Sequence, residues 1–232
     1  MSRTRLLLFD IDGTLMLSGG AGARALTRAL KQVFDLDNGL EGVRLGGQTD
    51  PQIVADALER RGLTAKATPT DVDRVRDLYL EYLAAEITQS DKAAVLPGVV
   101  ALLERLAVHP EVRLGLVTGN FERGARIKLG RFDLNRYFPL GGFGSDSIVR
   151  RELVPIAMDR ARAHYRLAFD ARDTVVIGDT EKDIDCGRHS GARTVAVCTG
   201  SIPAGALRAL EPDLFFESFA DTGAVADALL SL

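Results

Sequence analysis

The stretch Leu6-Leu7-Leu8-Phe9-Asp10-Ile11-Asp12-Gly13-Thr14 decides the fold class of this chain. Its first four residues are apolar, and similar apolar runs occupy residues 112–117, 174–177 and 194–197. Because these runs do not alternate between apolar and polar faces, each is expected to be a strand buried on both sides. Separated by segments of helix length, they predict a mostly parallel sheet between two helical layers, which is a Rossmann-like doubly wound α/β core.

About a hundred residues separate the first two runs, far more than the dozen or so that one crossover helix needs. The apolar residues of this stretch recur at helical spacing. Asp50-Pro51 indicates a helix start, with the Asp50 carboxylate as the expected N-cap and proline in the first turn. The sequence therefore predicts a group of helices inserted into the core.

This insertion defines the expected domains. We assign residues 15–93 to a helical cap domain and residues 1–14 and 94–232 to the α/β catalytic core. The glycine-rich residues 18–22 and the polar residues 90–92 are the expected hinges, because the chain must cross between the two domains there.

Composition narrows the classes of function. The 232 residues are 46% hydrophobic and 26% charged, as is usual for a globular protein. The net charge is −3 and no run of lysine or arginine occurs, so we expect no nucleic-acid partner. Aspartates interrupt the first apolar run, which argues against a signal peptide or membrane span and favours a cytoplasmic protein. Cys186 and Cys198 are expected to be reduced core residues.

Polar side chains follow three of the expected strands at the point where each ends. Asp10 and Asp12 follow the first, residues 118–120 (Thr-Gly-Asn) the second, and residues 178–183 (Gly-Asp-Thr-Glu-Lys-Asp) the third. Ligands of open parallel sheets bind beyond the carboxyl ends of the strands, so these groups should share one pocket. Asp10 and Asp12 are two residues apart and should project together while the chain is extended.

A cluster of carboxylates at this edge needs protons or a hard cation, and a ligand set made only of oxygen atoms is typical of Mg²⁺. Each segment alone could instead be a turn or a helix cap. Turns and helix caps alone do not readily explain why all three segments follow buried strands in this order. A metal-assisted reaction at an anion is therefore expected.

Three segments resemble the first, second and fourth motifs of the haloacid dehalogenase superfamily: residues 10–15 (DIDGTL), 116–120 (LVTGN) and 176–183 (VIGDTEKD). The resemblance covers essentially the whole chain. The position of the insertion is similar to that of the first cap subclass, which phosphoglycolate phosphatases and β-phosphoglucomutases share. Residues 46–53 (GGQTDPQI) resemble the substrate-facing cap segment of phosphoglycolate-phosphatase-like members. The resemblance thus makes three cap residues candidates for substrate binding: Gln48, Thr49 and Asp50.

The resemblance implies a role for each strand-end residue. Asp10 would attack phosphorus and form an aspartyl-phosphate, and Asp12 would serve as general acid and then general base. Thr118 and the backbone N–H groups of Gly119 and Asn120 would hold phosphate oxygens.

The same resemblance implies a Mg²⁺ site. Its ligands would be Asp10, Asp179 and the backbone carbonyl of Asp12, with Asp183 in support.

The third motif departs from the family pattern. It usually supplies a lysine, but no lysine lies between Gly141 and His164. Arg150 and Arg151 are the candidates, and the resemblance to members with arginine before Glu-Leu favours Arg150. The alternative is that both are exposed charges at a helix start. An arginine would clamp phosphate without shuttling protons.

The leading hypothesis is a Mg²⁺-dependent, phosphoglycolate-phosphatase-like phosphatase acting on a small phosphorylated metabolite, with no membrane partner, as a monomer or homodimer. The first alternative is a phosphosugar mutase of the β-phosphoglucomutase type, which the non-basic residues 48–50 disfavour. A dehalogenase is less favoured, because its reaction would not need Asp12. A non-catalytic binding module is disfavoured, because such a protein would be free to lose the aspartates that this chain keeps. The sequence names neither the physiological substrate nor the oligomeric state.

Overall fold

Six parallel strands form the central sheet of the computed structural model, which describes residues 4–232. The strand order is β5-β4-β1-β6-β7-β8. The bounds are β1 (Arg5–Phe9), β4 (Val112–Thr118), β5 (Gly141–Phe143), β6 (Thr174–Gly178), β7 (Arg193–Val197) and β8 (Leu214–Phe216). The expected α/β fold with a doubly wound parallel sheet is confirmed, and the four apolar runs are its four central strands.

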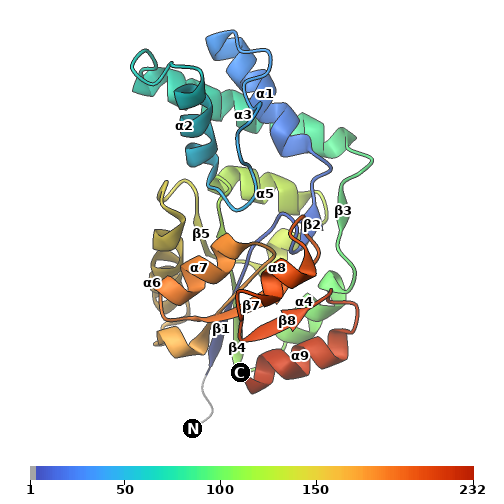
Figure 1. The fold of residues 1–232 in the computed structure, drawn as a ribbon. Coiled ribbons are helices and arrows are strands. Elements are labelled where there is room, and N and C mark those ends of the chain that lie inside the picture. Colours follow the sequence, from blue (N-terminus) through green and yellow to red (C-terminus); the bar gives the residue numbers. More distant parts are fainter. Residues whose placement is uncertain (1–3) are drawn as a thin grey trace.

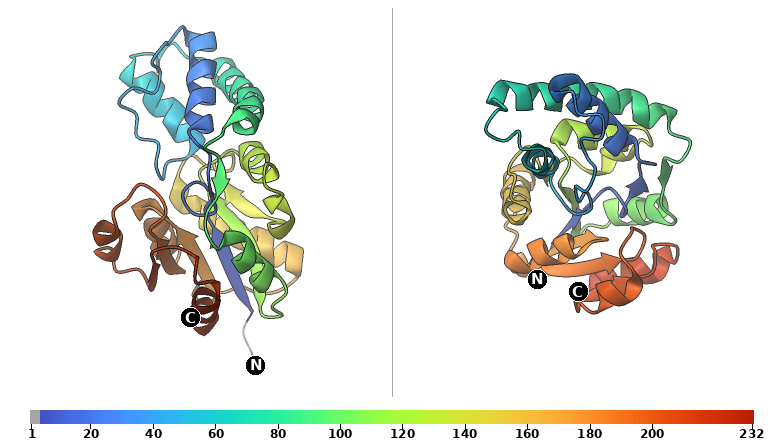
Figure 2. Two further views of the ribbon diagram at one scale, coloured as in Figure 1. Left: turned by 90° about the vertical axis from the view of Figure 1, so that its right-hand side faces the viewer. Right: turned by 45° about the horizontal axis from the view of Figure 1, so that its top comes forward.

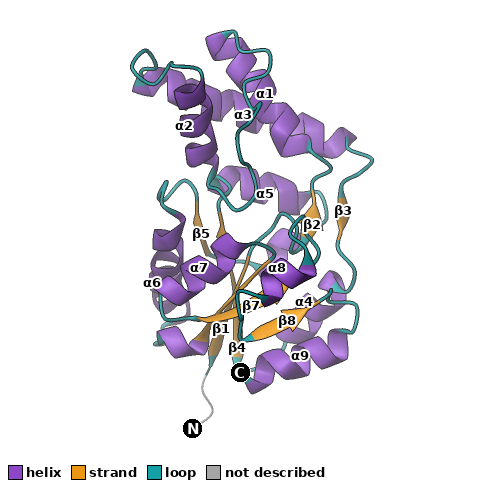
Figure 3. Ribbon diagram, viewed as in Figure 1, coloured by secondary structure: helices purple, strands orange, loops and turns teal. Residues whose placement is uncertain are grey.

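Helices cover both faces of the sheet (Figure 1, Figure 3). The side chains of β1 alternate between the faces: Leu7 and Phe9 pack in one apolar cluster, and Leu6 and Leu8 in another. The first cluster includes residues of α4 (Val99–Ala107), α5 (Glu122–Gly130) and α9 (Thr222–Ser231). The second includes residues of α6 (Leu153–Tyr165) and α7 (Glu181–His189). The remaining short helices are α8 (Ala204–Arg208), η1 (Leu134–Tyr137), η2 (Arg150–Glu152) and η3 (Ala171–Asp173).

Three helices between β1 and β4 form the expected insertion: α1 (Ala21–Phe34), α2 (Asp50–Arg60) and α3 (Pro69–Gln89). Figure 1 and Figure 2 show them beyond the carboxyl ends of the strands, at the opposite end of the molecule from the start of β1 and the C-terminus. The domain boundaries at residues 15 and 93 stay a prediction, and residues 1–3 of the expected core lie outside the described residues.

The two crossings between core and insertion lie side by side. Short antiparallel strands, β2 (Met16–Leu17) and β3 (Ala94–Val95), pair there. The Ser90 hydroxyl donates a hydrogen bond to the Ser18 carbonyl oxygen at 3.3 Å. Both segments expected to be hinges are thus parts of one narrow connection.

The expected N-cap of α2 was wrong by one residue. Thr49 is the cap, and its hydroxyl oxygen accepts a hydrogen bond from the Gln52 N–H at 3.2 Å. Asp50 is the first residue of the helix. Its carboxylate is free to contact the core instead.

Among the described residues, every helix is too short or too polar to cross a lipid bilayer.

Candidate active site

The ends of β1, β4 and β6 bring the strand-end residues of the sequence analysis into one place. The strands β4 and β6 flank β1, and the Asp10 N–H extends the β1–β6 ladder by donating to the Ile177 carbonyl oxygen at 2.9 Å. Asp10, Thr118 and Asp179 consequently line one cavity of about 500 Å³. All three side chains are buried.

The first half of this site is a cluster of three buried carboxylates. Oxygen atoms of Asp10, Asp179 and Asp183 lie within 4.8 Å of one another. Burial raises the pKa of Asp179 to about 8, and the nearby charges of Asp183 and Asp10 contribute to this rise. Burial also raises the pKa of Asp10 to about 6, although Arg150 opposes the shift. With a pKa of about 8, Asp179 keeps its proton at neutral pH unless a cation beside the cluster replaces it.

The glycine after Asp12 is required by this cluster. Gly13 has φ 86°, in the left-handed region. A Cβ atom at this position would lie 2.4 Å from Asp179 Oδ2. The Thr14 hydroxyl then donates a hydrogen bond to Asp179 Oδ1 at 3.1 Å, so the loop after β1 orients the carboxylate that follows β6.

Arg150 joins the carboxylate cluster from η2. Its Nη2 lies 2.5 Å from Asp183 Oδ1 and 3.4 Å from Asp10 Oδ1, and its Nη1 donates to the Gly47 carbonyl oxygen at 3.3 Å. The buried Nε of Arg150 has no acceptor among the described residues. Arg151, in contrast, is exposed and pairs with Asp185 through two contacts of 2.8 Å. Of the two candidates, Arg150 is therefore the one that lies beside Asp10.

Asp183 has a second function that is structural. Its Oδ2 accepts hydrogen bonds from the Thr180 N–H at 3.0 Å and the Thr180 hydroxyl at 2.7 Å, which closes a capping box at the start of α7. Its other oxygen pairs with Arg150. The helix start and the cluster are thus held by one fully buried side chain.

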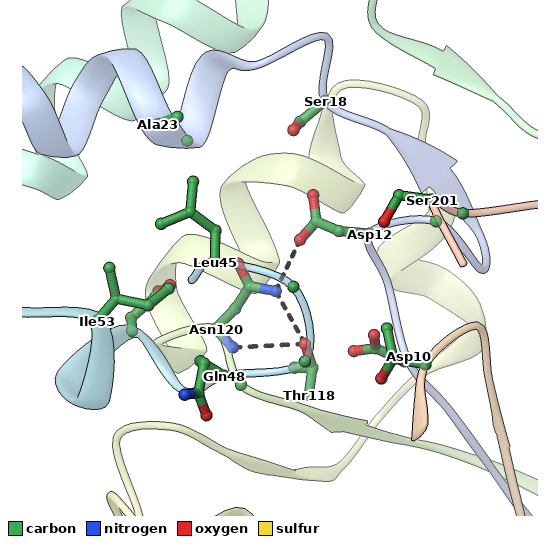
Figure 4. A pocket seen from close by; sticks show the side chains of 18 of the residues that line it. Asp10, Asp12, Ser18, Ala23, Leu45, Gln48, Ile53, Thr118, Asn120 and Ser201 are labelled. Atoms are coloured by element: carbon green, nitrogen blue, oxygen red, sulfur yellow. Dashed lines mark hydrogen bonds between the residues drawn. The ribbon is translucent and has the colours of Figure 1, made fainter. Parts of the chain in front are cut away.

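The second half of the site is built around Asp12 (Figure 4). Asp12 Oδ2 accepts a hydrogen bond from Asn120 Nδ2 at 3.0 Å and forms an ion pair with Lys128 Nζ at 2.6 Å. Asn120 Nδ2 also donates to the Thr118 hydroxyl at 2.8 Å, and Lys128 donates to Asn120 Oδ1 at 2.5 Å. Burial alone would raise the pKa of Asp12, but the Lys128 charge and these hydrogen bonds lower it below its usual range. The two aspartates that follow β1 therefore have opposite pKa shifts.

Lys128 is the residue that the sequence analysis missed. It lies on α5 and is almost fully buried, together with Gly124, Ala125 and Leu129 of the same helix face. The signal was present, because a lysine at a core-facing position of an amphipathic helix requires a buried partner. That partner, Asp12, is 116 residues away in the sequence, so spacing alone could not identify it.

The loop before α2 approaches the end of β4 so closely that only glycine fits there. A Cβ atom on Gly119 would lie 2.0 Å from the Gln48 carbonyl oxygen. The Asp50 N–H donates to the Gly119 carbonyl oxygen at 2.7 Å, and Asp50 Oδ2 accepts from the Phe121 N–H at 2.8 Å. The insertion thus contacts the segment that follows β4 directly, through backbone and side-chain hydrogen bonds.

The three candidate residues of this loop are placed differently. Gln48 and Asp50 line the cavity. The Thr49 hydroxyl donates to the Ile148 carbonyl oxygen at 2.9 Å, and Thr49 is not among the lining residues. Burial raises the pKa of Asp50 to about 6, although Lys128 opposes the shift.

Fold and site together place the chain in a known family. The family model described as haloacid dehalogenase-like hydrolase matches residues 4–191, so the chain belongs to this family of hydrolases, as the sequence motifs predicted. The carboxylate cluster at the ends of β1 and β6 fits the active site of such a hydrolase.

Individual relatives cover nearly the whole chain. It is similar to a probable phosphatase, IndB, of Dickeya dadantii, with 28% identity over 98% of this chain and 95% of the relative. It is also similar to a phosphoglycolate phosphatase of Haemophilus influenzae, with 28% identity over 93% of this chain and 95% of the relative. The crystal structure of a predicted phosphoglycolate phosphatase from Haemophilus somnus has the same fold, with a TM-score of 0.68, 22% identity, and coverage of 97% of this chain and 99% of the other.

Proposed function

We propose that this chain is a Mg²⁺-dependent phosphatase that hydrolyses a small-metabolite phosphomonoester through an aspartyl-phosphate on Asp10. One observation carries the proposal: Asp10 belongs to a buried carboxylate cluster that favours a cation, and two residues further on Asp12 is paired with Lys128. The relatives named as phosphatases support the same reaction class, and the fold and insertion resemble those of phosphoglycolate phosphatases.

The donor set suits Mg²⁺. Asp10, Asp179 and the backbone carbonyl of Asp12 would hold the ion, with Asp183 in support. When bound, the ion would offset the repulsion between the Asp10 carboxylate and the phosphate dianion. Burial and the charges of Asp183 and Asp10 raise the pKa of Asp179 to about 8, and this crowding of carboxylates favours a cation at this place.

Asp10 and Asp12 would have different roles in the reaction, Asp10 as nucleophile and Asp12 as general acid and base. Asp10 would attack phosphorus with a carboxylate oxygen. Lys128 and Asn120 hold Asp12 in its ionised form, and an incoming phosphate dianion would favour its protonation. That proton would go to the leaving oxygen, after which Asp12 would accept a proton from the water that hydrolyses the intermediate.

The phosphate oxygens would meet donors on both sides of Asp10. Thr118 and the backbone N–H groups of Gly119 and Asn120 would bind on the β4 side. Arg150 would bind on the side of the carboxylate cluster, where it lies 3.4 Å from Asp10 and where its Nε is available as a further donor.

Residues 15–93 would act as a cap that covers the site and excludes bulk water during turnover. The paired segments at residues 18–22 and 90–92 would be the hinge. The contacts of Asp50 with Gly119 and Phe121 would hold the cap against the core. Gln48, Thr49 and Asp50 are not basic, which favours hydrolysis over a phosphosugar mutase reaction.

The test is release of inorganic phosphate from a panel of phosphomonoesters with Mg²⁺. We expect turnover that stops with excess chelator and returns when Mg²⁺ is added. Asp10→Asn, which preserves the size of the side chain, should be inactive. Asp185→Asn is the matched control, because Asp185 is an exposed aspartate paired with Arg151 away from the cavity, and it should keep its activity. Full turnover of the parent in excess chelator, or of Asp10→Asn, would contradict the proposal.

A further inference from the structure

The wall of the cavity that faces Asp10 is apolar. Of the residues that line the cavity, those contributed by the insertion and its connection include six apolar side chains: Leu17, Ala23, Leu26, Leu40, Leu45 and Ile53. Figure 4 shows Leu45, Ile53 and Ala23 on the side of the pocket away from Asp10. A phosphate placed at Asp10 would direct the rest of its ester toward this wall.

No basic side chain of the insertion lines the cavity within residues 4–232. Arg24 and Arg28 pair with Glu86 at 2.7 and 2.9 Å, and Arg44 pairs with Glu181. The arginines of α1 and of the following loop are thus engaged outside the cavity.

The two cations that do line the cavity belong to the core and are already neutralised. Lys128 pairs with Asp12 and donates to Asn120, and Arg150 pairs with Asp183 and Asp10. A second anionic group on the substrate would lose its water without gaining a free cation.

Among the described residues, the polar groups that the insertion adds to the cavity include no cation that could neutralise a second anion. They are the side chains of Ser18, Gln48, Asp50 and Tyr79. Asp50 is a carboxylate and would repel a negative group, whereas the other three can exchange hydrogen bonds with a neutral hydroxyl or amide.

The apolar wall also reaches the mouth of the cavity. Leu17 is 42% exposed and Leu45 is 38% exposed, so a bound apolar group would remove their surface from water. The cavity volume of about 500 Å³ lies within the roughly 300–1,000 Å³ that is usual for small-molecule sites. There is room for an organic body beyond the phosphate.

We infer that the alcohol part of the substrate is uncharged and largely apolar, so that the enzyme prefers phosphomonoesters of neutral alkyl or aryl alcohols to esters that carry a carboxylate or a second phosphate. This inference rests on the proposed phosphatase activity and specifies its substrate class. It separates this chain from an enzyme dedicated to phosphoglycolate, because the alcohol part of phosphoglycolate carries a carboxylate.

The test compares substrates that differ by one charge. We would measure kcat/KM with Mg²⁺ for phenyl phosphate and 4-carboxyphenyl phosphate, and for butyl phosphate and phosphoglycolate. The neutral member of each pair should be favoured by at least about tenfold, because the site leaves the extra carboxylate without a partner.

A cation placed in the apolar wall should reverse the preference. Leu45→Arg adds a charge at a partly exposed position where the fold can accept a longer side chain, and it should improve the ratio of 4-carboxyphenyl to phenyl phosphate by about tenfold or more. Leu45→Gln, which adds polarity without charge, should leave this ratio near that of the parent. Leu17→Arg is a second variant of the same design, should Leu45→Arg fail to fold.

The outcomes separate the two claims. Hydrolysis of both members of a pair with equal or greater kcat/KM for the anionic ester would overturn this inference and leave the phosphatase proposal intact. An unchanged ratio in both folded arginine variants would also overturn it. Hydrolysis of no ester in either class would overturn the phosphatase proposal and this inference together.

Discussion

Replacement of Asp179 by asparagine should stabilise the chain in the absence of divalent cations, although Asp179 belongs to the site. Asp179 is buried beside Asp10 and Asp183, and its pKa is raised from 3.8 to about 8 by burial and by these neighbours. A carboxyl group with a raised pKa binds protons more tightly in the folded chain than in the unfolded chain. The free energy of unfolding therefore falls as pH rises from about 4 to about 8. Asparagine keeps an oxygen for the Thr14 hydroxyl and carries no charge.

The size of the effect follows from the pKa shift. The free energy of unfolding of the parent falls from pH 3.8, the ordinary pKa of the group, to pH 7. Over these roughly three pH units, at about 1.36 kcal/mol per unit, the loss is roughly 4 kcal/mol. Asp10 and Asp183 stay in place when Asp179 is replaced, so we expect asparagine to recover about half of this, ~2 kcal/mol. For a chain of 232 residues, that gain corresponds to an increase in Tm of about 4–8 °C.

Thermal unfolding in chelator, followed by circular dichroism from about pH 4.5 to about pH 8.5, measures this gain. The Tm of Asp179→Asn minus that of the parent should be near zero at the acidic end and largest near pH 8. Mg²⁺ should raise the Tm of the parent more than that of the variant. Asp185→Asn is the control, since the Arg151 partner lowers the pKa of Asp185 and its loss should not stabilise. A variant no more stable than the parent at pH 8 would refute the reasoning.

Two further substitutions test the groups on either side of Asp10. Arg150→Ala should lower kcat by ~10²–10³, as loss of one preorganised donor does, and Arg150→Lys should restore part of it. Arg151→Ala should leave kcat within about twofold, because Arg151 is exposed, and a larger effect of Arg151 in steady-state kinetics would show that the third motif is misplaced. Lys128→Met should lower kcat more than it raises KM and should move the acidic limb of the kcat profile to higher pH, because the pKa of Asp12 is no longer lowered. Lys128→Arg should restore part of the rate, and a pH profile unchanged in Lys128→Met would contradict a positioning role.

The central strands and the residues at their ends were predictable because both follow from local sequence. An apolar run such as Leu6 to Phe9 can be buried on both faces only in a covered sheet, and parallel strands bring their carboxyl ends to one edge. The edge strands β5 and β8 were not predicted. Each has three residues, too few to show a periodicity, and their assignment depends on pairing with β4 and β7.

The parts of the site that escaped prediction depend on contacts between distant segments. Lys128 is identified only by its pairing with Asp12. The resemblance favoured Arg150 over Arg151, but the local sequence does not encode the path of η2 that brings Arg150 beside Asp183. The N-cap residue of helix α2 is Thr49 and not the expected Asp50, and this difference also depends on a distant segment. Asp50 accepts a hydrogen bond from the Phe121 N–H across the cap–core contact, and nothing in the local sequence encodes that partner.

The central claim is that Asp10 carries the phosphoryl group during turnover, and chemical trapping of the intermediate tests it most directly. The parent would be mixed with a good phosphomonoester and Mg²⁺, quenched during steady state and reduced with borohydride, which converts an aspartyl-phosphate to homoserine. Peptide mass spectrometry should then find homoserine at position 10 in the parent and aspartate there when substrate is omitted. Active enzyme with unmodified Asp10, or with homoserine at another aspartate, would contradict the account.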